Sequence, residues 1–123
     1  RGCSPGAAAL LKGAADSSPL RESILFEQAH YAAKRMAPQA AELLANFITL
    51  AETPALKTQA RLDQAEVALN LNPPDLETVQ AILPLLEKEQ LSPEQTMQLA
   101  RLNILEAESR QTGVSGRQRR LVL

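Results

Sequence analysis

The sequence predicts an all-α fold with five main helices, and three observations lead to that prediction. Prolines recur at a nearly constant interval, and a run of good helix formers follows each of them. Aromatic residues make up only 2% of the 123 residues, so the core must be built from alanine and leucine, which favours closely packed helices over a β-sandwich. No segment shows the sustained apolar–polar alternation that is typical of a strand.

The proline spacing places the helices along the chain. Successive prolines at positions 19, 38, 54 and 73 are separated by 19, 16 and 19 residues. A further interval of 19 residues separates Pro74 from Pro93. Proline suits the first helical position because its missing N–H would have no partner there. The predicted helices cover residues 19–35, 38–52, 54–70, 74–89 and 93–111, and a short helical turn is expected over 5–12, closed by Gly13.

Residues that favour helix N-caps stand before most of these prolines. Ser18, Thr53 and Ser92 each precede a proline, and Asn72 precedes Pro73. Ser92 and Gln95 also have the spacing of a capping box. Ser92 is therefore interpreted as a helix cap, which explains it without a role as a phosphorylation target.

The apolar pattern predicts which helix faces are buried. The helix over 54–70 has two apolar stripes, Leu62/Ala65/Leu69 and Leu56/Ala60/Val67, which is typical of a helix between two neighbours. Pro84 falls inside the fourth helix and is expected to kink or split it. The stripes expected in the other helices are Leu25, Ala29, Ala32 and Met36; Ala40, Leu44, Phe47, Ile48 and Ala51; Leu76, Val79, Leu83 and Leu86; and Met97, Ile104 and Ala107, near Leu102 and Leu105.

Short phrases recur along the chain. FEQAHYAAKR (26–35) aligns with LDQAEVALNL (62–71) at an offset of 36 residues, and DQAEVALN (63–70) aligns with LEAESRQT (105–112) at an offset of 42. A small residue thus recurs once per helix pair, at Ala29, Ala65 and Ala107. This recurrence indicates stacked helix pairs, in which two helices must approach closely.

With these alanines, Ala41 and Pro54, residues 20–111 resemble the tetratricopeptide family. The resemblance implies antiparallel helix pairs stacked as a short right-handed solenoid over 19–112, with a leader or linker over 1–18 and a basic tail, or the start of a truncated element, over 113–123. Residues one and five places after each recurring alanine share a helix face. The resemblance implies that this face is a partner-binding groove lined by His30, Lys34, Glu66, Asn70, Glu108 and Thr112.

The amino-terminal GCS, Gly2 to Ser4, resembles the processing site of a bacterial lipoprotein, in which Cys3 would be lipidated. With phrases such as ARLDQAEVAL and QLSPEQTMQLARLNILEAE, the chain resembles the amino-terminal domain of outer-membrane lipoproteins that activate penicillin-binding proteins. That resemblance implies a periplasmic location, outer-membrane anchoring and a peptidoglycan synthase as partner. A pilus-assembly lipoprotein, or a cytoplasmic tetratricopeptide-like adaptor or co-chaperone without lipid, remains an alternative.

Charge and residue types argue against other classes of function. Residues 20–109 contain thirteen acidic and seven basic residues, which is unfavourable for binding nucleic acid. With one cysteine and one histidine, no metal site or cofactor is expected. No converging set of catalytic groups is evident, so the chain is predicted not to be an enzyme. The alternative from another class is a helical enzyme that uses His30 with a neighbouring carboxylate.

Overall fold

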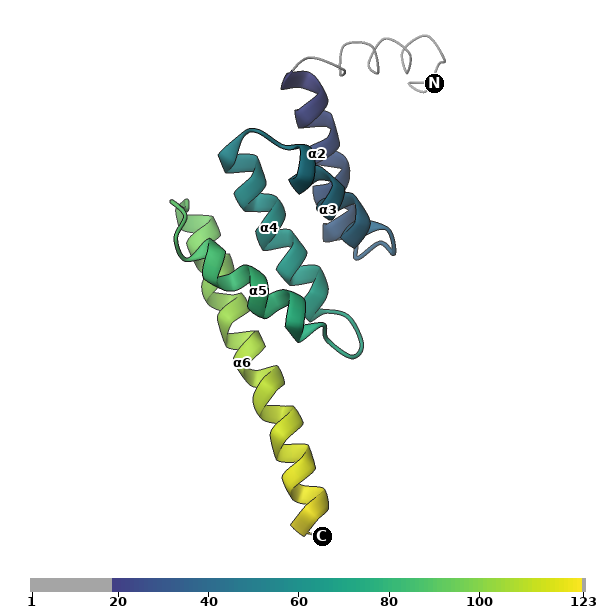
Figure 1. Cartoon of the computed structure of the whole chain (residues 1–123), viewed down its shortest axis with the longest axis vertical. Helices are drawn as coiled ribbons and strands as arrows, with labels where there is room; N and C mark the ends of the chain where they lie inside the picture. Colours follow the sequence, from purple (N-terminus) through teal and green to yellow (C-terminus); the bar gives the residue numbers. More distant parts are fainter. Residues whose placement is uncertain (1–18, 123) are drawn as a thin grey trace.

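The computed structural model describes the backbone of residues 19–122 and the side chains of residues 20–112. This part of the chain is all-helical, with five helices and no strand (Figure 1). The helices are α2 (Pro19–Lys34), α3 (Ala40–Leu50), α4 (Pro54–Leu69), α5 (Leu76–Leu86) and α6 (Pro93–Val122). The predicted turn over 5–12 and the Cys3 lipidation site lie outside the described residues.

Helix α4 is the centre of the fold. It packs against each of the other four helices, and Figure 1 shows it between α2 and α3 on one side and α5 and α6 on the other. Every helix also packs on the next one along the chain, whereas within the described residues no Cα atom of α2 lies within 8 Å of a Cα atom of α6. The helices are therefore positioned relative to one another mainly through α4.

The core consists of two apolar clusters, which lie on opposite faces of α4. Ala60 and Val67 pack with residues of α2 and α3, and Leu56 lies against the same cluster. Leu62 and Ala65 pack with residues of α5 and α6. The two stripes predicted for this helix are confirmed. The residues that each cluster adds from the other helices include Phe26, Ala29, Ala32, Leu44 and Phe47 in the first, and Val79, Ile82, Leu83, Leu86, Leu99 and Leu102 in the second.

The helix starts agree with the cap pattern only in part. The capping box of α6 is confirmed, because the Gln95 N–H donates to Ser92 Oγ and the Ser92 N–H donates to Gln95 Oε1, both at 3.1 Å. The expected start of the fourth helix at 74 is wrong. Asp75 is the N-cap of α5, and its Oδ1 accepts from the Thr78 N–H at 3.2 Å. A carboxylate two residues after Pro73 therefore caps the helix in place of Asn72.

Two other boundaries differ from the sequence-based expectation. Pro38 lies in the turn before α3, which begins at Ala40. Thr53 occupies the N-cap of α4 but forms no side-chain cap. Instead its N–H and hydroxyl, together with the Glu52 N–H, donate to the carboxylate of Glu22 at the start of α2. These hydrogen bonds lower the pKa of Glu22 and join the first turn of α2 to the start of α4.

Helices α5 and α6 both differ from the extent predicted from the sequence. Pro84 does not split α5, which continues to Leu86. The proline removes the bond that residue 84 would donate to the Gln80 carbonyl, and the helix ends two residues later, at Leu86. Helix α6 continues to Val122, well past the predicted end at residue 111, and its C-terminal part extends beyond the other helices (Figure 1).

The apolar pattern expected in the last helix is wrong in part, because Leu102 is buried and Leu105 packs against the core but the stripe named with them does not. Met97, Ile104 and Ala107 are exposed, and α6 packs through Leu99 and Leu102 on the opposite side. This helix therefore carries apolar residues on two faces, and the face with Leu99 and Leu102 packs on α4 and α5.

The recurring alanines provide a test of the packing. Ala29 and Ala65 are fully buried at close helix contacts, whereas Ala107 is exposed. We expect Ala65→Leu to lower the free energy of unfolding by about 1–3 kcal/mol, because three extra heavy atoms must be forced into a filled interface. Chemical denaturation followed by circular dichroism measures this change.

The matched control is Ala107→Leu, which makes the same substitution at the exposed member of the set. We expect it to change the free energy of unfolding by no more than about 0.5 kcal/mol. Equal destabilisation by the two substitutions would contradict the assignment of Ala65 to a close helix contact.

Candidate functional site

An open groove of about 990 Å³ crosses the face formed by α2, α4 and α6. This volume is at the upper end of the range of about 300–1,000 Å³ for small-molecule pockets. The groove is lined by Phe26, Glu27, His30, Ala33, Lys34 and Met36 from α2 and the turn after it, by Gln59, Asp63 and Glu66 from α4, and by Glu94, Met97, Gln98 and Arg101 from α6.

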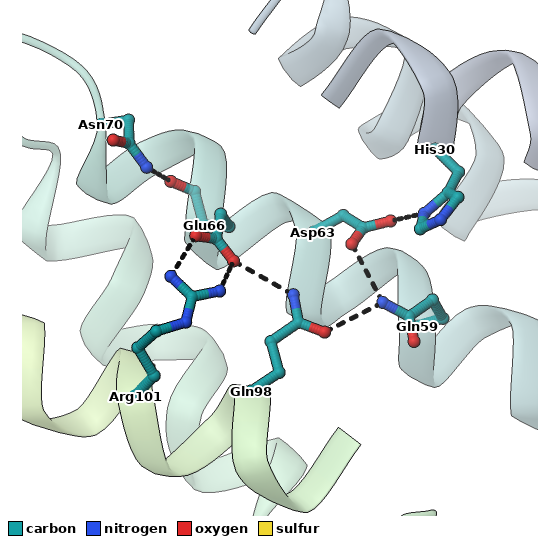
Figure 2. Close-up of polar contacts among 7 residues, drawn as sticks. All are labelled: His30, Gln59, Asp63, Glu66, Asn70, Gln98 and Arg101. Carbon is teal, nitrogen blue, oxygen red and sulfur yellow. Dashed lines mark hydrogen bonds and ion pairs between the residues drawn. The ribbon is translucent and has the colours of Figure 1, made fainter. Parts of the chain in front are cut away.

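The floor of the groove is a continuous chain of hydrogen bonds, which we call the polar seam (Figure 2). From α2 to α6, Asp63 bonds to both His30 and Gln59, and Gln59 Nε2 also donates to Gln98 Oε1 at 3.1 Å. Gln98 Nε2 then donates to Glu66 Oε1 at 3.1 Å. The polar seam consists of His30, Gln59, Asp63, Glu66, Gln95, Gln98 and Arg101.

The α2 end of the seam is a histidine–carboxylate pair. His30 Nδ1 lies 2.5 Å from Asp63 Oδ2, and the imidazole stacks on the Phe26 ring with the centroids 5.1 Å apart. Burial raises the pKa of Asp63, because desolvation outweighs its hydrogen bonds to His30 and Gln59. Burial therefore makes the ionised form of the Asp63 carboxyl unfavourable. Its hydrogen-bond partners offset part of this desolvation free energy.

The α6 end of the seam is a two-point ion pair. The two terminal nitrogens of Arg101 donate to the two carboxylate oxygens of Glu66, each at 2.6 Å. Burial of Glu66 opposes its ionisation, but the hydrogen bonds from Arg101 and Gln98 outweigh it and lower its pKa. The fork geometry of the guanidinium fixes the position of α6 along α4 at this level.

Two methionines form exposed apolar walls above the floor. Met97 on α6 is 75% exposed and Met36, just after α2, is 44% exposed. Met36 has φ 52°, in the left-handed region that costs a non-glycine residue roughly 1–2 kcal/mol. The turn closes with hydrogen bonds from Met36 N–H to Ala33 O and from Ala37 N–H to Ala32 O, a pattern in which glycine is usual.

The structure brings together half of the groove residues predicted from the sequence. His30, Lys34 and Glu66 line the groove. The other three predicted residues, Asn70, Glu108 and Thr112, are exposed and do not line it. Asn70 ends α4 and its side chain donates to the Glu66 carbonyl at 2.8 Å. Glu108 and Thr112 were placed from Ala107, which is itself exposed on α6.

Several groove residues were not identified from the sequence, although a signal was present. Gln59, Asp63 and Glu66 are spaced i, i+4, i+7, and Glu94, Gln98 and Arg101 repeat that spacing in the last helix. Such a spacing places three polar residues on one helix face. A search for this shared polar stripe would have found the α4 and α6 sides of the groove, whereas nothing in the pattern singles out Met36.

The groove has limited chemical capability. A carboxylate that holds a histidine ring resembles part of a general-base arrangement. The lining, however, includes no serine, threonine, cysteine or tyrosine. Within the described residues, no group of three or more His, Cys, Asp or Glu side chains could hold a metal ion, and no buried polar side-chain atom lacks a partner. The polar atoms of the floor are therefore largely occupied by one another.

A smaller cleft of about 320 Å³ lies between α5 and α6. Glu106 on its wall accepts hydrogen bonds from Gln80 at 2.9 Å and from Arg110 at 2.7 Å. These bonds lower the pKa of Glu106 despite its burial. The contacts explain the buried carboxylate as part of the α5–α6 packing.

Comparison with protein-family models, curated proteins and solved structures found no match for this chain. Within the described residues, no helix combines the length and apolar character needed to span a membrane.

The opposite pKa shifts of Asp63 and Glu66 predict opposite pH dependences of stability. The pKa of Asp63 is raised in the folded state. Its contribution to the free energy of unfolding is therefore present below the ordinary pKa of 3.8 and is lost as pH rises through the folded-state pKa. We expect the wild type to lose stability relative to Asp63→Asn as pH increases over that window. Denaturant unfolding at a series of pH values measures the difference.

Glu66→Gln is the comparison of opposite sign. The pKa of Glu66 is lowered, so its contribution is present above the ordinary value of 4.5 and lost as pH falls through its folded pKa. The wild type should therefore gain stability relative to Glu66→Gln as pH rises. If both differences had the same sign, the interpretation of one carboxylate as buried at a cost and the other as stabilised by Arg101 would be wrong.

Proposed function

We propose that this chain is a non-catalytic protein-interaction module, built as a short tetratricopeptide-like right-handed solenoid. In this proposal α2/α3 and α4/α5 are antiparallel helix pairs and α6 begins a third. The packing supports it, because each helix contacts the next and α4 also contacts α2 and α6, the helices two places away. A stack in which every repeat contacts only its neighbours produces that pattern.

The proposed function of the groove is to bind a segment of a partner protein. The observation that carries this proposal is the contrast between floor and walls. The polar seam satisfies its own hydrogen bonds, whereas Met36 and Met97 expose large apolar side chains above it. Methionine side chains adapt to irregular partners and are common on surfaces that bind peptides.

A catalytic role has one observation in its favour, the bond between His30 and Asp63. The groove lining offers this pair no hydroxyl or thiol that it could activate as a nucleophile. Asp63 is also bonded to Gln59 at 3.0 Å within the seam, which gives the pair a structural explanation as the join between α2 and α4. We therefore favour the binding role.

The resemblance to lipoprotein activators of penicillin-binding proteins supplies the proposed cellular setting. In that setting Cys3 carries a lipid, the module faces the periplasm from the outer membrane, and the partner is a peptidoglycan synthase. A pilus-assembly lipoprotein and a cytoplasmic adaptor or co-chaperone are the alternative settings. The proposed groove is the same in each, so its test does not depend on the setting.

The groove is tested by site-specific photo-crosslinking in the cells from which the gene comes. A photoreactive amino acid at position 97 should crosslink to a partner protein, because Met97 is exposed within the groove. The adduct should weaken strongly when Met36→Gly is added, and mass spectrometry would identify it. Position 104 is the control, because Ile104 is 58% exposed on the same helix but does not line the groove. Equal crosslinking from both positions would contradict a specific groove.

The proposed anchor is tested by metabolic labelling of the full-length gene product with radioactive palmitate. We expect labelling of the wild type and its loss in Cys3→Ser, because the thiol is the acceptor of the lipid. An unlabelled wild type would reject the lipoprotein setting and favour the cytoplasmic alternative.

A further inference from the structure

We propose that the groove selects a cationic amphipathic helix, one that presents lysine or arginine side chains beside large aliphatic ones. This inference rests on the proposed function and specifies the chemistry of the partner. Two observations support it. Some carboxylates of the groove have no hydrogen-bond or ion-pair partner among the described residues, and these carboxylates lie beside the exposed methionines.

The groove lining is acidic. Four carboxylates, those of Glu27, Asp63, Glu66 and Glu94, lie among two cations, which gives a net charge of −2 with His30 neutral. The ion pair with Glu66 occupies one of the two cations, Arg101. The attraction for a positively charged segment is therefore a property of the groove as a whole.

The carboxylates that remain available are those at the rim. Glu27 and Glu94 are exposed, and neither forms a hydrogen bond or ion pair with another described residue. Lys34 is the remaining cation of the lining. Two rim carboxylates without partners, on opposite walls, can each meet a cation of a ligand without breaking any bond of the polar seam.

The acidic and apolar contact points are adjacent on the α6 wall. Glu94 and Met97 are three residues apart on α6, so their side chains share a face about 5–6 Å apart at Cβ. A ligand that meets both must present a cation and an aliphatic group at the same separation. Residues three or four apart on a second helix have that separation, which favours a helical ligand over an extended one.

The α2 wall provides the second apolar contact point at a conformational cost. Met36 takes a left-handed backbone conformation at which glycine would be favoured, and its side chain is 44% exposed at the groove. The position therefore keeps a side chain that the fold alone does not require. Backbone strain of this kind is frequent at ligand-binding positions.

The experiment uses three synthetic helical peptides that share one leucine face and carry lysine, glutamine or glutamate on the other face. Binding to the full chain is measured by fluorescence anisotropy. We expect the affinity to follow the order lysine, glutamine, glutamate. Substitution of both rim carboxylates, Glu27→Gln with Glu94→Gln, should weaken binding of the lysine peptide by about fivefold.

The matched control removes the same charge elsewhere. Glu42→Gln with Glu77→Gln changes two exposed carboxylates that do not line the groove. This control should leave the affinity for the lysine peptide within about twofold, because general attraction to an acidic protein falls off with distance. Equal weakening by the two double substitutions would overturn the assignment of the cationic contacts to the rim.

Met36→Gly tests the apolar contact without risk to the fold, since glycine relieves the left-handed backbone. It should weaken all three peptides while thermal unfolding occurs at the same or a higher temperature. Tighter binding of the glutamate peptide than of the lysine peptide, with the same sensitivity to Met36→Gly, would overturn the cationic selection and leave the groove as the binding site. Failure of all three peptides to bind would overturn the inference, while the crosslinking at position 97 decides the proposed function separately.

Discussion

The burial of two faces of α4 is the constraint on which the rest of the structure depends. Ala60 and Val67 on one face and Leu62 and Ala65 on the other hold the remaining helices in place. Because alanines at these contacts let the helix backbones approach closely, a chain with 2% aromatic residues can still fill its core. The groove is a result of this arrangement, since its floor is the third, polar face of the same helix.

The polar seam links this core to the proposed binding surface. Asp63 is buried at a cost, and its bonds to His30 and Gln59 partly offset that cost. Bonds of this kind have directional requirements that apolar contacts lack, so they favour one register of α2 and α6 along α4. A ligand then meets a preorganised floor and has to order only the exposed side chains of the walls and rim.

The sequence predicted the helices and the two apolar stripes of α4 because both depend on local periodicity and on prolines at helix starts. It was less successful where two local signals competed. The pattern of the last helix centred on the exposed Met97, Ile104 and Ala107 and omitted the buried Leu99, and the residues extrapolated from Ala107 do not line the groove. Asp63 and Met36 were missed because their roles depend on a neighbour thirty-three residues away and on a single backbone angle.

Within the described residues, the backbones of α2 and α6 do not approach each other, and both helices pack on α4. The two walls of the groove are connected through α4. The width of the groove therefore depends on how α2 and α6 are each oriented against α4. Met36 stands on the α2 wall and Met97 on the α6 wall. Substitutions where α2 or α6 packs on α4 should therefore change the separation of Met36 and Met97 without changing either residue.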